Sequence, residues 1–176
     1  MNPKALQKLG YGLYVVTSRM GDRLNGQIAN TVFQITSEPP TVAVSINKNN
    51  LTHDYIDESK VFTASVLGTS TPLPFIGRFG FRSGRDFNKL EGVNYKIGKT
   101  GAPVILENTV ACVEARVVKQ MDVGTHTIFV GEIVDAEILN DKEEYMTYAI
   151  YHQVKRGTTP STAPTYIAEV KEVKQA

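Results

Sequence analysis

Residues 25–52 carry the side chains with the clearest potential for chemistry. One polar group lies in a first apolar run and consists of Asn30, Thr31 and Gln34. A second group follows the next apolar run and combines hydroxyls, amides and one ammonium: Ser45, Lys48, Asn49 and Thr52. Amides and hydroxyls can hydrogen-bond a flat heterocycle, and an ammonium beside exposed backbone amides can hold a phosphate. The pattern predicts a strip that binds a heterocycle at one end and a phosphate at the other.

Each of these residues also has a purely structural interpretation. Lys48 could be a turn lysine in water, and Thr52 could be an ordinary helix cap. Asn30 and Gln34 could be polar strand positions that face solvent. The residues alone leave both interpretations open.

Three other features of the sequence could take part in chemistry. Gly77–Lys89 is a glycine-rich basic segment that is either a solvated loop or part of a site. His53, His126 and His152 are far apart in sequence without paired-ligand spacing, which argues against a metal site. The single Cys112 lies in an apolar run and favours a packing role over a nucleophilic one. No dinucleotide-binding GxGxxG after a strand and no P-loop occurs. A cofactor that itself carries the chemistry is therefore favoured.

Length and charge limit the classes of protein that fit. A chain of 176 residues with 41% hydrophobic residues predicts one domain, residues 1–176. Its net charge of +1 predicts no attraction to nucleic acid or to a membrane surface. One cysteine suits a reducing compartment, and the opening residues show no apolar signal segment. We expect a soluble cytoplasmic protein without a membrane span.

The elements that position these residues are predicted to be mainly strands. Strand-like runs cover 14–18, 28–35, 41–46, 61–67, 110–118 and 127–139, and shorter ones cover 95–98 and 103–106. Helices are expected over 3–9, over 51–59, from Thr71 onward and over 142–154, whereas 157–164 is expected to be irregular. The fold class is therefore mainly β, a closed or nearly closed barrel with short peripheral helices.

Several motifs together give a family resemblance. They are Asn25-Gly26, Asn30-Thr31, Ser37-Glu38-Pro39-Pro40, Val44-Ser45, residues 81–86 (FRSGRD), residues 101–104 (GAPV), Gly124-Thr125-His126 and residues 130–133 (VGEI). In this order and spacing the chain resembles the flavin reductase-like, FMN-binding split-barrel family. Within it, Met146-Thr147-Tyr148, Tyr151-His152 and residues 163–166 (APTY) resemble flavoredoxin-like proteins and the flavin domain of high-molecular-weight rubredoxins.

The resemblance implies an FMN-binding split β-barrel with short peripheral helices, and a homodimer in which the partner chain completes each FMN groove. It implies that the isoalloxazine contacts Asn30, Thr31, Val32, Phe33 and Gln34. The ribityl chain and phosphate would contact Ser45, Ile46, Asn47, Lys48, Asn49 and Thr52. A second loop near the flavin would supply Arg82, Ser83, Gly84 and Lys89.

His126 is the catalytic candidate, because many family members have Gly-Asp-His at this position, near the nicotinamide or flavin edge. Here the aspartate is replaced by Thr125. The implied activity is an FMN-binding oxidoreductase that takes hydride from NADH or NADPH and passes electrons to a flavin, a ferric complex or a redox protein such as a rubredoxin. The alternative is a non-enzymatic FMN electron carrier that exchanges electrons only with protein partners. A structural role for His126 also stays open.

Overall fold

The structure is a computed structural model that describes residues 3–166. The chain begins with a 3₁₀ helix η1 (Pro3–Lys8) and then forms the first strands. The strands are β1 (Tyr14–Met20), β2 (Arg23–Ala29), β3 (Val32–Ser37), β4 (Pro40–Asn47), β5 (Val61–Leu67), β6 (Tyr95–Ile97), β7 (Pro103–Ile105), β8 (Thr109–Val123) and β9 (His126–Ile138). The helices are α1 (Leu51–Ser59), α2 (Leu73–Gly80) and α3 (Tyr148–Gln153). The mainly β prediction is confirmed.

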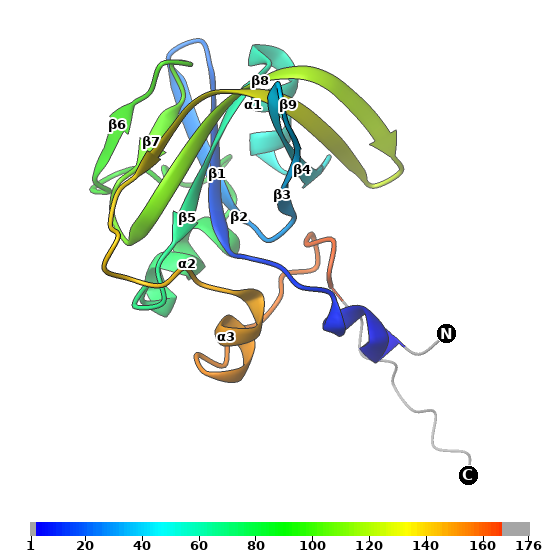
Figure 1. The fold of residues 1–176 in the computed structure, drawn as a ribbon, viewed down its shortest axis with the longest axis vertical. Helices are drawn as coiled ribbons and strands as arrows, with labels where there is room; N and C mark the ends of the chain where they lie inside the picture. The colour runs from blue at the N-terminus through cyan, green and yellow to red at the C-terminus, as the bar shows by residue number, and fades with distance from the viewer. Residues whose placement is uncertain (1–2, 167–176) are drawn as a thin grey trace.

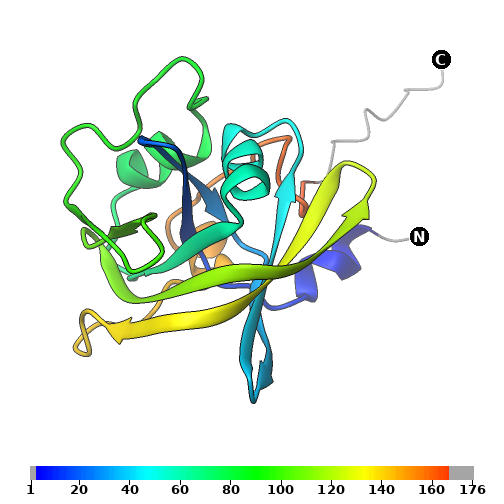
Figure 2. The same cartoon turned by 90° about the horizontal axis from the view of Figure 1, so that it is seen from above.

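The main sheet has the strand order β2-β1-β5-β8-β9-β4-β3, and all of its pairings are antiparallel. It curls around a central core, with α1 and α2 placed against it and α3 below its end (Figure 1). Seen from above, the β3–β4 hairpin and the β8–β9 turn project from the barrel in different directions (Figure 2). Because β2 and β3 are the two edges of one sheet, the barrel is split rather than fully closed.

The core has two parts, and each follows from apolar residues that alternate along the strands. One part packs Leu13, Leu67 and Met146 against Phe75 and Phe79 of α2. The other packs Val44 and Ile46 of β4 against Phe62 and Phe129. Burying such side chains contributes roughly 1.5–3 kcal/mol each. The two clusters fix β4, α1 and α2 relative to one another, and these elements hold most of the predicted site.

The predicted strand over 28–35 is wrong as a single element. The structure divides it between β2, which ends at Ala29, and β3, which starts at Val32. The break at Asn30 and Thr31 has a physical reason, because the Thr31 hydroxyl donates to the Ser45 carbonyl oxygen at 3.2 Å and the Asn30 amide donates to the Thr165 hydroxyl at 2.8 Å. This link carries the chain from one edge of the sheet to the other.

The predicted helix over 142–154 is also too long. Only Tyr148–Gln153 is helical, and Thr147 caps it by accepting a hydrogen bond from the Ile150 amide at 3.1 Å. Before it, Met146 pairs through its backbone with both Leu13 and Leu67, which holds this stretch extended. Tertiary pairing therefore overrides the local helix preference. Strand β8, by contrast, is longer than predicted: it continues to Val123, beyond the predicted end at 118.

Candidate functional site

A cavity of about 500 Å³ opens where the barrel is split. Its walls come from the end of β2, the end of β4, the first turn of α1, helix α2 and the loop that follows α2. Tyr148 and Tyr151 of α3 and residues from 158 to 164 also line it. We call residues 157–166 the strap, the orange-to-red segment after α3 in Figure 1. The polar lining residues include Gln27, Asn30, Ser45, Asn47, Asn49, Asn50, Thr52, Ser83, Lys89, Tyr148 and Tyr151.

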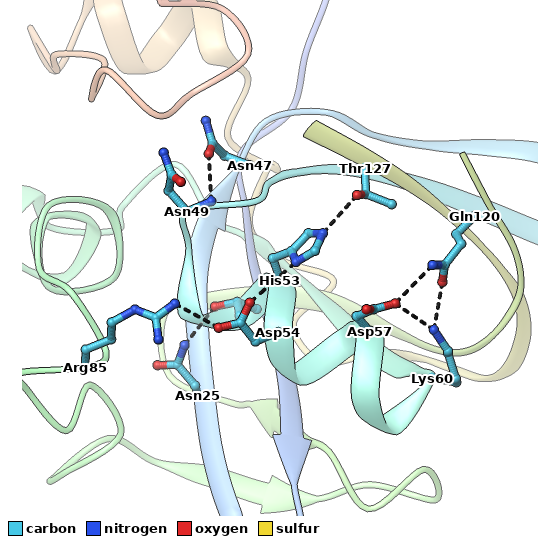
Figure 3. Close-up of polar contacts among 11 residues, drawn as sticks. Asn25, Asn47, Asn49, His53, Asp54, Asp57, Lys60, Arg85, Gln120 and Thr127 are labelled. Carbon is cyan, nitrogen blue, oxygen red and sulfur yellow. Dashed lines mark hydrogen bonds and ion pairs between the residues drawn. The ribbon is translucent and has the colours of Figure 1, made fainter. Parts of the chain in front are cut away.

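The first turn of α1 forms the end of the cavity that is suited to bind an anion. Asn50 is the N-cap residue, and its side chain makes no capping hydrogen bond. The first-turn amides are therefore free of a side-chain cap, and such amides favour a negative charge. Thr52 is almost completely buried, and its hydroxyl accepts a hydrogen bond from the Asn25 amide at 2.9 Å. The Asn47 side chain holds the Asn49 amide at 3.0 Å, which fixes the approach to the helix (Figure 3).

Lys89 supplies a buried amine to the same cavity. It is only 6% exposed, and its ammonium donates to the Phe79 carbonyl oxygen at 3.1 Å. Burial lowers the pKa of Lys89 to about 8, because water is removed from around the charge. A cation held in this way is stabilised by an anion that enters the cavity.

The structure brings eight of the residues predicted to bind cofactor together around the cavity. They are Asn30, Ser45, Asn47, Asn49, Thr52, Ser83, Gly84 and Lys89. The others do not line it. Ile46 is fully buried in the core, whereas Phe33 is 57% exposed and Gln34 hydrogen-bonds the Thr36 carbonyl at the surface. Thr31 lies in the link between β2 and β3, and Val32 is the first residue of β3. The Arg82 guanidinium lies over the Phe87 ring at 4.4 Å.

Lys48 lies beside the site with its charge already paired. Its ammonium is 2.5 Å from an Asp122 carboxylate oxygen across the β8–β9 turn. This hydrogen bond, together with one from the Gly124 amide, lowers the pKa of Asp122. A phosphate contact from Lys48 would require that pair to be exchanged, so the predicted contact stays a prediction.

His126 lines a second, adjacent cavity of about 360 Å³. Its Nδ1 is 2.9 Å from the Thr125 hydroxyl, and its Nε2 is 3.3 Å from the Thr162 carbonyl oxygen of the strap. Burial lowers the pKa of His126, which the contact with Thr162 partly offsets, so the imidazole is neutral at pH 7. Thr125, which replaces the expected aspartate, therefore supplies a hydroxyl partner for the ring.

Sequence reasoning missed several residues of the cavity wall. Gln27 of β2 is 8% exposed, and its Oε1 is the one buried side-chain atom without a hydrogen-bond partner among residues 3–166. A polar residue within a buried strand was the available signal. Tyr148 and Tyr151 also line the cavity, and their helical spacing was visible in the sequence. The composition of the strap indicated only an irregular segment, and residues 163–166 contributed only to the family resemblance, so the place of the strap at the cavity was not predicted.

Other groups in the described chain have structural roles. The network on the outer face of α1 joins His53 to Thr127, Asp54 to Arg85 and Asp57 to Lys60 (Figure 3). Cys112 is buried, and burial raises the pKa of its thiol to about 11. Over residues 3–166, no group of three His, Cys, Asp or Glu side chains is placed to hold a metal ion. Within the same range, no helix is long and apolar enough to cross a membrane.

Comparison with known proteins agrees with this geometry. Residues 6–158 match the model of the flavin reductase like domain. The chain belongs to this family. A flavin reductase-like domain thus spans most of the chain, and the predicted family and split-barrel fold are confirmed.

Two relatives extend over nearly the whole chain. The "High molecular weight rubredoxin" of Moorella thermoacetica is 54% identical over 176 residues, which is all of this chain and 76% of that protein. The "Ferric-chelate reductase (NAD(P)H)" of Archaeoglobus fulgidus is 56% identical over 166 residues, which is 94% of this chain and 98% of that protein. Among solved structures, an FMN-binding protein from Thermus thermophilus with bound p-hydroxybenzaldehyde superimposes with a TM-score of 0.70 at 25% identity, covering 78% of this chain and 75% of that one.

Proposed function

We propose that this flavin reductase-like protein binds FMN in the cavity at the split of the barrel and uses it to oxidise NADH or NADPH. The observation that carries the proposal is the cavity itself, in which an uncapped helix start and a buried lysine face the same space as amide and hydroxyl side chains. Such a combination suits a ligand with a phosphate at one end and a hydrogen-bonding ring at the other.

Two further features of the cavity wall fit such a ligand. The unpartnered Gln27 oxygen can accept a hydrogen bond that no protein group supplies among the described residues. At Gly84 the loop backbone lies so close to Asn25 that a Cβ atom would collide with the Asn25 side chain. An unpaired buried acceptor costs about 1–3 kcal/mol, which a bound donor would recover. The residues present therefore fit FMN.

In this proposal the chain holds and orients the cofactor. The α1 amides, Thr52, Ser83 and Lys89 hold the phosphate, and Asn30 and Ser45 contact the ring and ribityl side. The bound FMN supplies two-electron chemistry that the side chains lack. His126, neutral at pH 7, contacts the nucleotide or holds a proton at its Nε2 at the edge of the second cavity. The strap lines both cavities.

The names of two relatives suggest which class of electron acceptor the protein uses. The relative from Archaeoglobus fulgidus is named for ferric-chelate reduction, which favours a ferric complex as one acceptor class. The relative from Moorella thermoacetica is named a rubredoxin, which favours the alternative of an FMN carrier that passes electrons to a redox protein. These 176 residues contain one cysteine, which is buried in β8, so they do not supply the cysteine ligands of a rubredoxin-type iron centre.

We also propose a homodimer in the cell's reducing cytoplasm. Every residue of β3 is at least partly exposed, and Phe33 and Ile35 on this edge strand are 57% and 45% exposed. Met121 on the projecting end of β8 is 53% exposed. An apolar, unpaired sheet edge is a surface that a second copy would cover. A partner copy would also explain why Phe33 and Gln34 face away from their own cavity. Sedimentation analysis of the wild type and of Phe33→Ser tests this, and a monomeric wild type would contradict it.

The main test is titration with FMN followed by anaerobic stopped-flow mixing with NADH and with NADPH. We expect saturable FMN binding and fast bleaching of the flavin. Slow bleaching with fast reduction by a redox protein would support the carrier alternative. Gly84→Val should weaken FMN binding by crowding Asn25, whereas Gly77→Ala, at a position with open space around it, should not. Protein that stays colourless and shows no spectral change with FMN would refute the proposal.

A further inference from the structure

The strap separates the two cavities of the site. Ser161, Ala163 and Pro164 line both the larger cavity and the smaller one that contains His126. In Figure 3 the strap's ribbon passes above Asn47, and both Asn47 and Ser45 also belong to both cavities. A displacement of this one segment would therefore change access to both ligand positions.

Helix α3 holds the strap through side-chain hydrogen bonds. The Tyr148 hydroxyl is 2.5 Å from the Thr159 hydroxyl, and it accepts a hydrogen bond from the Thr165 hydroxyl at 3.1 Å. The Tyr151 hydroxyl donates to the Thr158 carbonyl oxygen at 2.8 Å. The Tyr148 ring is itself fixed, because it lies 4.3 Å edge-on from the His152 ring and stacks on Tyr151 at 5.9 Å. Tyr148 thus joins the two ends of the strap to a rigid aromatic cluster.

The strap's own backbone provides little hold. Among residues 3–166, the backbone hydrogen bonds of the strap from Thr158 onward are those of two local turns, from the Ala163 amide to the Pro160 carbonyl oxygen and from the Tyr166 amide to the Ala163 carbonyl oxygen. Within the same range the strap pairs with no strand of either sheet. A segment held by a few side-chain contacts opens at a lower free energy than the sheet beneath it. The hydroxyl of Tyr148 therefore has a large share in keeping the strap closed.

The strap also occupies hydrogen-bonding groups that the proposed ligands would use. The Asn30 amide donates to Thr165, and His126 Nε2 contacts the Thr162 carbonyl oxygen. Asn30 is predicted to contact the flavin, and His126 is predicted to contact the nucleotide or the flavin edge. Asn30 has a second N–H and a carbonyl oxygen besides the hydrogen bond to Thr165, so FMN can contact it with the strap in place. A ligand at His126 Nε2 would compete with the Thr162 carbonyl oxygen.

We propose that Tyr148 is a positioning residue that holds the strap closed over the larger cavity, and that opening of the strap sets how long FMN stays bound. This inference rests on the proposed function. It means that the residence time of FMN, and hence its behaviour as a fixed cofactor or an exchanging substrate, depends on α3 and not on the phosphate-binding end alone.

The test compares FMN release from the wild type and from Tyr148→Phe, which keeps the ring and removes the hydroxyl. Tyr145→Phe is the matched control, because Tyr145 is 55% exposed and its hydroxyl makes no hydrogen bond to the strap among the described residues. We expect Tyr148→Phe to release FMN about 3-fold to 30-fold faster in stopped-flow dilution, which corresponds to about 0.7–2 kcal/mol. Amide hydrogen exchange across 157–166 should rise in Tyr148→Phe, with the exchange of β8 and β9 unchanged.

A second variant distinguishes loss of the strap contact from a folding defect in Tyr148→Phe. Thr159→Val removes the Tyr148–Thr159 hydrogen bond from the strap side, together with the 3.4 Å contact of Thr159 with His152 Nε2. It should give the same direction of change, and the double variant should show less than the sum of the two single effects because one hydrogen bond is shared. Unchanged FMN release and unchanged exchange of the strap in both single variants would overturn the inference while leaving the proposed function intact. If the wild type itself bound no FMN, the proposed function would fail first.

Discussion

Lys89 makes opposite contributions to stability and to binding, and substitution by methionine separates them. Its folded-state pKa of about 8 is below the value of about 10.4 expected for an unfolded chain. Holding the charged form at pH 7 therefore costs on the order of 3 kcal/mol. Methionine keeps the apolar stem and removes the charge. We expect Lys89→Met to raise the free energy of unfolding of the FMN-free protein at pH 7 by about 1–3 kcal/mol, since the lost contact with Phe79 offsets part of the gain.

The pH dependence of the stability gain in Lys89→Met shows whether the gain comes from removing the buried charge. Between about pH 8 and pH 10.4 the unfolded chain binds more protons at Lys89 than the folded chain does, so this group makes the wild type more stable as pH rises. The cost is fully present below pH 8 and disappears above about pH 10.4. Urea unfolding at pH 7 and at pH 10.5 should therefore show a gain for Lys89→Met that shrinks toward zero. Lys119→Met, at an exposed lysine, is the control.

Lys89→Met should weaken FMN binding, although it raises the free energy of unfolding. A hydrogen bond to a charged group contributes roughly 1.5–3 kcal/mol, so Lys89→Met should weaken FMN binding about tenfold to a hundredfold at pH 7. Riboflavin, which lacks the phosphate, should be unaffected. If riboflavin binding falls equally, Lys89 contacts the ring and not the phosphate. A variant that is destabilised equally at both pH values, with unchanged FMN affinity, would refute the reasoning.

Four further substitutions test other parts of the site and its support. Lys48→Ala should weaken FMN binding by about tenfold if Lys48 leaves Asp122 for the phosphate, and Asp122→Asn should then strengthen it; unchanged titrations for both would place Lys48 outside the site. His126→Ala should slow flavin reduction in anaerobic stopped-flow and leave FMN affinity unchanged, and wild-type reduction with wild-type nucleotide affinity would remove it from the mechanism. Glu114 is 3% exposed and accepts hydrogen bonds from both amides of 99–100 and from the Thr100 hydroxyl. Glu114→Ala should lower the free energy of unfolding by about 2–4 kcal/mol in urea, and a loss below about 1 kcal/mol would contradict this role.

Local patterns in the sequence carried much of the fold. The alternation of apolar residues located β1, β4, β5, β8 and β9, and the Pro39-Pro40 pair marked the turn between β3 and β4. Asn49 and Thr52 were identified as site residues because their types suit a phosphate, and Lys89 was identified through the family resemblance; the structure places all three at one cavity. Local patterns did not predict the break at Asn30-Thr31 or the start of α3. At both places contacts with distant residues outweigh the local preference for strand or helix.

The sequence by itself determined the strands, the family and the polar residues that can hold a phosphate, because these depend on residue type and on short-range spacing. Only the tertiary structure decided which of those residues share one space. It pairs Lys48 with Asp122, buries Ile46 in the core and turns Phe33 outward, while it brings Gln27 and Tyr148 to the cavity wall. The physical reason is that the cavity forms between elements far apart in the chain, and its last wall is a strap whose position depends on side-chain hydrogen bonds with no local signature.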